Sequence, residues 1–181
     1  MADLEKELSI WTIGHSTHPI EEFIEMLLEF KIDLLADVRT IPRSRHNPQF
    51  NKDELPGSLA AFKIGYEHLE NLGGLRHAVK DSVNFGWRNR SFRGYADYMQ
   101  TAEFAAAIDD LVEQIKKKRI AIMCAEAVPW RCHRSLIGDA LVVRGLNVQD
   151  IFSADDSKPH SLTKFAKVNE LKITYPETSL F

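Results

Sequence analysis

The sequence is poor in cysteine, with only Cys124 and Cys132 among its 181 residues. Two cysteines cannot form the disulfide framework of a small secreted domain, so a reducing cytoplasm is the expected location. No apolar run approaches the ~20 residues that span a bilayer, and no membrane partner is expected. The first residues, Met1–Glu7, are acidic and polar and do not resemble a signal peptide. Together these absences predict a cytoplasmic protein.

Several familiar motifs are also missing. The chain contains no G-x-G-x-x-G and no P-loop, so a standard dinucleotide or ATP site is not expected. Phosphatase and rhodanese loops place an arginine closer to the strand-end cysteine than Arg131 stands to Cys124, and they carry glycines that are absent here. Cys124-Ala-Glu126 and Pro129-x-x-Cys132 imitate the zinc deaminase signature, but the gap between them cannot hold the intervening elements. The motifs in the sequence therefore predict no particular cofactor.

Charge is distributed unevenly along the chain. The formal net charge is −3, but residues 39–93 contain ten Lys/Arg and five Asp/Glu, so this segment carries +5 and the remainder −8. A basic insert in an acidic protein suggests an anionic small molecule or a nucleic acid as partner. The alternative is a solvated loop whose arginines pair with nearby carboxylates. The oligomeric state has no signature in the sequence.

The hydrophobic pattern alternates between short apolar runs and helical periodicities. It predicts strands at 8–14, 33–38, 65–69, 119–124 and 148–152. It also predicts a helix that begins at Pro19 and four further helices at about 53–63, 94–118, 133–144 and 161–170. This order is typical of a three-layer α/β fold, Rossmann-like or flavodoxin-like, with a mostly parallel sheet and helices on both faces. A long irregular insert covers about 39–93. Length predicts a single domain, 1–181, with the tail from about 153 docked on it.

Polar or ionisable side chains follow three of the predicted strands. They are His15 and Ser16 after the first strand, Asp37 and Arg39 at the end of the second, and Cys124 and Glu126 at the end of the strand at 119–124. Because the carboxyl ends of parallel strands line one edge of a sheet, where ligands bind, we expect these side chains to converge. The sequence therefore predicts a site at this edge.

The segment 124–134 carries most of the chemistry. Cys132 lies near a predicted helix start and among cations, which favour a thiolate, whereas Cys124 could be an ordinary buried cysteine. One of the two is the expected nucleophile or ligand, with His133, His15 and Glu126 as acid–base groups. The expected substrate is anionic and could be nucleotide-like. The residues expected to bind it are Ser16, Asp37, Arg39, Arg43 and Arg134.

Two alternatives remain open at this stage. Cys124, Cys132 and His133, with His15 and Glu126 nearby in the predicted fold, are adequate zinc ligands, although their spacing matches no structural zinc module. The second alternative is a nucleic-acid-binding or repair-associated module in which the cysteines are structural.

Two segments of the insert favour this second alternative. Residues 43–50 and 84–93 mix arginines with aromatic residues, a combination that suits phosphates and stacked bases. Trp87 and Phe92 could equally anchor a long loop to the core.

Short motifs spread over nearly the whole chain resemble the family called domain of unknown function 488. They are Thr12–Ser16, Asp37–Arg39, Pro42–Ser44, Asn47–Phe50, Leu72–Gly74, Phe92–Ala96, Cys124–Glu126, Cys132–Arg134 and Pro159–Thr163. The resemblance implies an α/β domain and an enzyme, without an established reaction. It also implies that His160 belongs to the substrate-binding residues. The chain departs from the family at Asp150, where related sequences often carry histidine.

Overall fold

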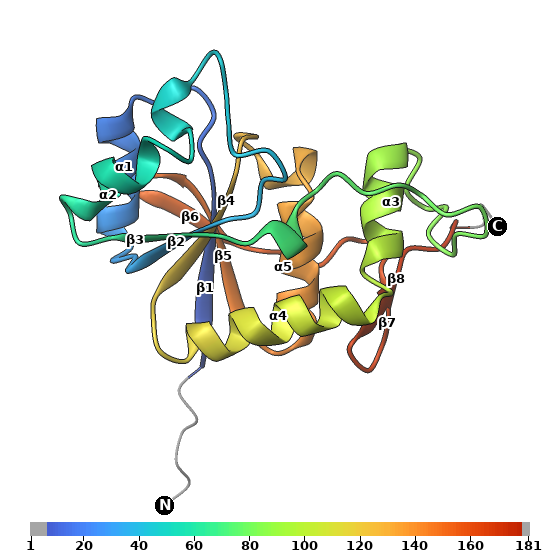
Figure 1. Ribbon diagram of the computed structural model, residues 1–181. Helices are drawn as coiled ribbons and strands as arrows, with labels where there is room; N and C mark the ends of the chain where they lie inside the picture. Colours follow the sequence, from blue (N-terminus) through green and yellow to red (C-terminus); the bar gives the residue numbers. More distant parts are fainter. Residues whose placement is uncertain (1–6, 179–181) are drawn as a thin grey trace, which may run out of the picture.

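The computed structural model describes residues 7–178, and its centre is a six-stranded sheet (Figure 1). The strands are β1 (Ser9–Gly14), β2 (Leu34–Asp37), β3 (Gly65–His68), β4 (Ile120–Cys124), β5 (Asn147–Ser153) and β6 (Asp156–Pro159). Their order is β3-β2-β4-β1-β5-β6, with β1 to β5 parallel and β6 antiparallel to β5. A separate hairpin joins β7 (Lys167–Asn169) to β8 (Lys172–Thr174).

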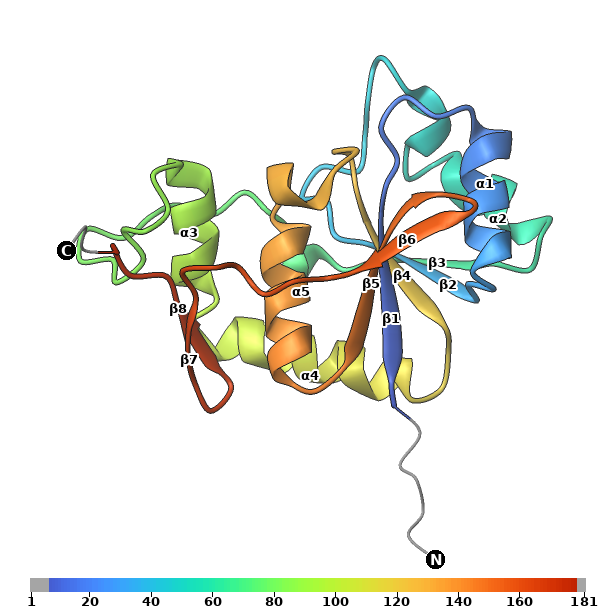
Figure 2. The ribbon, with the colours of Figure 1, turned by 180° about the vertical axis from the view of Figure 1, so that it is seen from behind.

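Helices cover both faces of the sheet, which confirms the predicted three-layer α/β fold. One face carries α1 (Ile20–Glu29) and α2 (Leu55–Ala60), and the other carries α4 (Ala102–Ile115) and α5 (Arg134–Val143), with α3 (Arg90–Tyr98) beyond α5 (Figures 1 and 2). Alternate residues of each strand enter the two layers, because side chains of a strand point to opposite faces in turn. Within residues 7–178, no helix is both long enough and apolar enough to cross a membrane.

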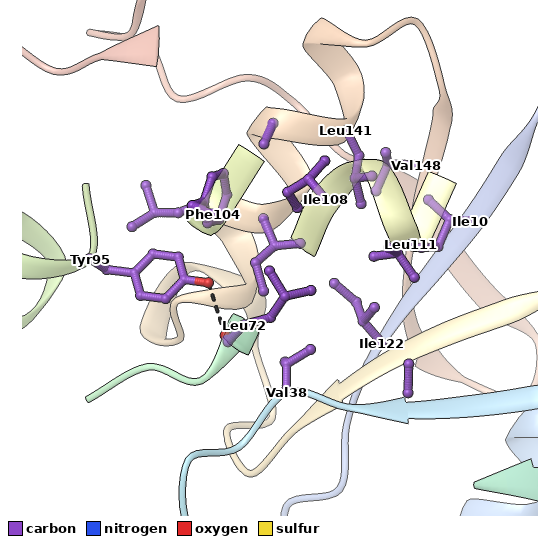
Figure 3. Close-up of a cluster of buried hydrophobic side chains, with 14 of the residues drawn as sticks. Ile10, Val38, Leu72, Tyr95, Phe104, Ile108, Leu111, Ile122, Leu141 and Val148 are labelled. Carbon is purple, nitrogen blue, oxygen red and sulfur yellow. Dashed lines mark hydrogen bonds between the residues drawn. The ribbon is translucent and has the colours of Figure 1, made fainter. Parts of the chain in front are cut away.

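The two layers bury separate hydrophobic cores. On β4, Ala121 and Met123 pack with residues of α1 and α2, whereas Ile120 and Ile122 pack under α4 and α5. Figure 3 shows the second core, in which the phenol of Tyr95 donates to the carbonyl of Leu72 at 2.9 Å. This bond ties α3 to the basic insert.

The strand order places a topological switch point between β1 and β4. It differs from the Rossmann order 3-2-1-4-5-6 and from the flavodoxin order 2-1-3-4-5. The chain leaves β1 for α1 on one face and leaves neighbouring β4 for α5 on the other (Figure 1). Such a topological switch point is where open α/β sheets bind ligands.

Two predicted helices are wrong. The helix expected at 94–118 is divided into α3 and α4, because the hydroxyl of Thr101 accepts the backbone N–H of Phe104 at 3.2 Å and caps a new helix. The helix expected at 161–170 is replaced by coil and the β7–β8 hairpin. The backbone of this hairpin bonds to the rest of the domain, because the side-chain amide of Gln100 donates to the carbonyl of Ile173 at 2.7 Å.

The insert is held by aromatic contacts of the kind that the anchoring alternative described. Trp87 stacks on Phe92 at 4.8 Å and contacts Phe165 and Tyr175 of the tail. The tail therefore docks on the insert through these rings. Gly145 follows the C-cap Arg144 of α5 and has a positive φ of +82°, the conformation in which glycine commonly ends a helix.

Candidate functional site

The three polar strand ends meet at the carboxyl edge of the sheet, as the sequence predicted. Beyond the ladders, the N–H of His15 donates to the carbonyl of Cys124 at 2.9 Å, and that of Ser16 to Ala125 at 2.9 Å. On the other side of β4, the N–H of Val38 donates to the carbonyl of Met123 at 3.0 Å. These bonds extend the pairing past the strands and fix the three loops relative to one another.

A pocket of about 740 Å³ opens above this edge. Its walls come from segments 15–17, 39–47, 74–75, 91–92 and 124–133. The predicted site residues that line it are His15, Ser16, Arg39, Arg43, Cys124, Glu126, Cys132 and His133. Three others, Asp37, Arg134 and His160, do not line it. We expected these three residues to contact a substrate directly, but their positions outside the pocket lining do not favour such contact.

Asp37 is a partner of Arg39. The carboxylate is fully buried and accepts Nε of Arg39 at 2.9 Å, Nη2 at 2.6 Å and the phenol of Tyr66 at 2.6 Å. Burial and this carboxylate together raise the pKa of Tyr66. The guanidinium of Arg39 is thus held in a bidentate pair, so Arg39 brings little free positive charge to the pocket.

His15 is fixed in one neutral tautomer. Its Nδ1 lies 2.8 Å from the carbonyl of Ser16 and therefore carries the proton, while Nε2 accepts from Nη1 of Arg39 at 3.2 Å. The ring also stacks on Phe50 at 4.4 Å. Burial, together with the charge of Arg39, lowers the pKa of His15 to about 4. With both nitrogens occupied, His15 orients Arg39 and is not free to act as a base.

Ser16 has the positive φ of 45°, which non-glycine residues adopt at an energetic cost. The strained backbone turns the chain out of β1 and over the pocket.

His133 faces the second cysteine. Its Nε2 donates to the carbonyl of Val38 at 2.8 Å, which leaves Nδ1 without a proton and 3.5 Å from Sγ of Cys132. Burial lowers the pKa of His133 to about 4. Gly74 lies flat against this ring, where a Cβ atom would stand 2.4 Å from Nδ1. The ring is therefore a neutral acceptor held at the thiol of Cys132.

The pKa values of the two thiols are shifted in opposite directions. Burial opposes ionisation of Cys124, but the thiol of Cys132 and the charge of Arg134 outweigh it and lower the pKa of Cys124. Burial and the neighbouring Cys124 raise the pKa of Cys132. These directions favour Cys124 as the thiol that ionises, whereas the sequence favoured Cys132. Cys132 lies two residues before α5 and is 7% exposed, and Sγ of Cys124 lies 3.8 Å from the carbonyl oxygen of Glu126.

Arg134 lies behind Cys124 and is completely buried. Nη2 donates to the carbonyl of Ala127 at 3.2 Å, while Nε and Nη1 have no partner, and within residues 7–178 no salt bridge joins Arg134 to a carboxylate. A Cβ atom on Gly14 would stand 2.8 Å from Nη1. The guanidinium is thus enclosed by the β1 end and the loop after β4, outside the pocket lining, and its charge lowers the pKa of Cys124.

The exposed rim of the pocket carries the remaining charged side chains. Arg43 and Arg131 are both exposed, and Arg43 has only a loose pair with Asp53 at 3.6 Å, which contributes little in water. Glu126 is exposed and faces the same pocket. Two cations and one carboxylate therefore face an incoming ligand.

His160 lies on the far side of α5, against Gly138, and belongs to a buried polar network. Its Nε2 is 3.0 Å from Asp139 and its Nδ1 is 3.0 Å from Asp150. Asp150 also accepts the hydroxyl of Thr12 at 2.5 Å. Burial opposes the charge of His160, but the two carboxylates outweigh it and raise its pKa to about 9. The ion triad fastens the tail to the sheet, so His160 and Asp150 have structural positions.

This triad predicts a pH-dependent stability. The pKa of His160 rises from about 6.5 unfolded to about 9 folded, so its stabilisation is complete below pH 6.5 and is lost as pH rises through 9. The difference corresponds to at most about 3 kcal/mol. Urea unfolding across this range should show a decline that His160→Gln removes. His15 and His133, with pKa values of about 4, do not titrate in this window. An equal decline in wild type and variant would assign the effect to other groups.

Within residues 7–178, no group of three or more His, Cys, Asp or Glu side chains is arranged to hold a metal ion.

The sequence did not identify several residues that shape the site. Gly14, Gly74 and Phe50 fit closely around the functional side chains. Glycine and phenylalanine carry no reactive group, so their presence within the motifs was the one available signal.

Comparison with known proteins gives a family and no reaction. No curated protein and no solved structure matches the chain. The family model described as "Domain of unknown function DUF488" matches residues 19–141, which include β2, the basic insert, the loop after β4 and most of α5. His15 and His160 lie outside the matched range. Because the match covers more than half of the chain, this protein belongs to the DUF488 family.

Proposed function

We propose that the chain is a thiol-dependent enzyme in which Cys124 is the nucleophile toward an anionic substrate held in the pocket. One observation carries this proposal: the buried guanidinium of Arg134 lies behind Cys124 with two unpartnered nitrogens and no carboxylate counter-ion in the described chain. Nucleophilic catalysis by cysteine requires the thiolate, and a neighbouring cation favours it.

The energetic argument concerns the burial of charge. An ionised group removed from water costs several kcal/mol unless an opposite charge and hydrogen bonds compensate it. The thiolate of Cys124 supplies such a charge for Arg134. The hydrogen bond from Cys132 stabilises the same thiolate. The arrangement therefore favours a Cys124 anion in a site that is otherwise poor in negative charge.

The rim of the pocket supports an anionic substrate. Arg43 and Arg131 are exposed and line the pocket, and neither is held in a buried ion pair. Arginine recognises carboxylate and phosphate groups through paired donors. Glu126, which also lines the pocket, is placed to transfer a proton to or from a bound substrate.

The test is the pH dependence of alkylation by iodoacetamide, followed by mass spectrometry. Cys132→Ser leaves only Cys124 to report, and Cys124→Ser leaves only Cys132. We expect Cys124 to react at neutral pH with a midpoint below the value of about 8.5 for a free thiol, and Cys132 to react only at higher pH. A midpoint for Cys124 at or above that value would remove the basis of the proposal.

A second candidate function, nucleic-acid binding, is favoured by the surface of residues 75–93. Four large apolar side chains of this segment are exposed, namely Leu75, Val79, Val83 and Phe85. Lys80, Arg88 and Arg90 are exposed among them, and Arg93 stacks over Phe85 at 5.0 Å. Exposed aromatic and basic side chains together suit single strands, whose bases stack and whose phosphates pair with cations.

Binding of a short single-stranded oligonucleotide at several salt concentrations tests this second function. If the segment grips phosphates, affinity should fall steeply with salt, and Arg88→Ala with Arg90→Ala should reduce the logarithmic slope by about 0.7 for each lost contact. Lys117→Ala is the matched control, because Lys117 lies with Leu8 and Ser9 near the start of β1, away from the pocket. An equal effect of control and test variants would indicate nonspecific attraction.

A further inference from the structure

The two cysteines, far enough apart in sequence to belong to different elements, meet in the folded chain. Cys124 ends β4 and Cys132 precedes α5, and both line the same pocket. Both are free thiols, 2% and 7% exposed, and each influences the ionisation of the other. Two thiols that line one pocket can exchange a disulfide when their backbones permit the short Cβ separation of that bond.

The second thiol has its own proton acceptor. Nδ1 of His133 is unprotonated and lies 3.5 Å from Sγ of Cys132, because Nε2 donates its proton to Val38. The backbone N–H of Arg134 also points at this sulfur, at 3.5 Å. A thiol that meets a base on one side and another sulfur on the other has the geometry of a resolving cysteine.

We propose that Cys124 and Cys132 form a dithiol–disulfide site that reduces a small disulfide carrying anionic groups. The inference rests on the proposed function, because Cys124 must first be a nucleophile. It adds the substrate class and assigns Cys132 and His133 to a second step.

The reaction balances as two successive exchanges. The thiolate of Cys124 attacks one sulfur of the substrate, forming a mixed disulfide and releasing the other half as a thiolate. Cys132 passes its proton to Nδ1 of His133 and attacks Sγ of Cys124, which releases the second half as a thiolate. His133 returns the proton to that leaving group. The protein is oxidised by two electrons and the substrate reduced by two, and an external dithiol restores the pair by the reverse exchange.

The charge of the pocket selects among disulfides. Arg39 is neutralised by Asp37, so Arg43 and Arg131 are the guanidinium groups on the wall that can meet a ligand. A disulfide with carboxylates fits these cations, whereas one with amines is repelled by them.

The experiment uses the full chain, reduced and freed of reductant, with glutathione disulfide as the anionic probe and cystamine as the cationic control. Intact mass is recorded against time. We expect wild type to lose two hydrogens and to form a Cys124–Cys132 disulfide, faster with glutathione disulfide than with cystamine. Cys132→Ser should instead accumulate a glutathione adduct on Cys124. His133→Gln should slow the disappearance of the adduct without slowing its formation.

The possible outcomes separate this inference from the proposed function. If wild type keeps a stable adduct and forms no internal disulfide, Cys132 does not resolve and the inference fails. It also fails if Cys124 is alkylated at neutral pH but glutathione disulfide does not react, or if cystamine reacts faster; the nucleophile proposal survives in both cases. If Cys124 reacts with neither reagent, both proposals fall. The intact-mass measurement on the wild-type protein does not depend on whether any variant folds.

Discussion

Replacing Gly14 with alanine is expected to destabilise the protein by about 3 kcal/mol, the upper end of the range for overpacked sites. The added Cβ would stand 1.7 Å from the carbonyl oxygen of Glu126 and 2.8 Å from Nη1 of Arg134. The nearest obstacle is backbone, so rotation of a side chain cannot relieve it. The end of β1 must move away from the loop after β4, and the Cys124 thiol should lose its activation with it.

Gly57→Ala provides the matched control for this substitution. Gly57 lies inside α2, and apart from its chain neighbours and the helix backbone no atom lies within 4 Å of a Cβ built there. Alanine favours a helix over glycine by about 0.5–1 kcal/mol, so this variant should be neutral or slightly more stable. Urea unfolding of the two variants and wild type measures the difference. Similar free energies of unfolding for both variants would show that the contact between β1 and the loop can yield at little cost.

The layers of the fold were predictable because they depend on local periodicity. The apolar run at 119–124 and the helical spacing after Pro19 each report which face an element buries. The strand order was not predictable in this way. Whether β1 pairs with β2 or with β4 depends on contacts between distant segments, and the hydrophobic pattern of each strand is compatible with either neighbour.

The errors in secondary structure have a common physical origin. Phe104, Ile108 and Leu111 continue the helical spacing that begins near Tyr95, so the pattern gives no break. The break comes from the capping hydroxyl of Thr101, whose single bond outweighs a continuous stripe. In the tail, tertiary hydrogen bonds such as that from Gln100 to Ile173 replace the local helix.

The location of the candidate site was predictable, whereas the roles within it were not. Polar residues at strand ends identify an edge, and the chain brings His15, Arg39 and Cys124 to that edge. Which thiol ionises depends on how the loop after β4 folds, because this decides which neighbours surround each sulfur. Likewise, sequence spacing cannot show that Arg131 faces solvent while Arg134 is completely buried.

Replacing Arg134 with methionine is expected to have the largest effect on reactivity. The substitution keeps much of the buried volume and removes the positive charge behind Cys124, so the pKa of that thiol should rise. Each unit of pKa corresponds to about tenfold in the thiolate fraction below the midpoint, and we expect alkylation at neutral pH to slow by at least about tenfold. The measurement is the pH profile of alkylation in a Cys132→Ser background.

Arg131→Met is the matched control, because this arginine is exposed at the pocket rim and its charge is screened by water. Its profile should remain close to that of wild type, while its affinity for an anionic substrate should fall. Arg134→Lys keeps the charge without the planar fork and should retain a lowered midpoint, which guards against a methionine variant that folds poorly. Thermal unfolding identifies that case directly. If a folded Arg134→Met protein kept the alkylation profile of its Cys132→Ser parent, the charge of Arg134 would not be what stabilises the thiolate. The lysine and methionine variants together therefore separate the charge of Arg134 from its shape.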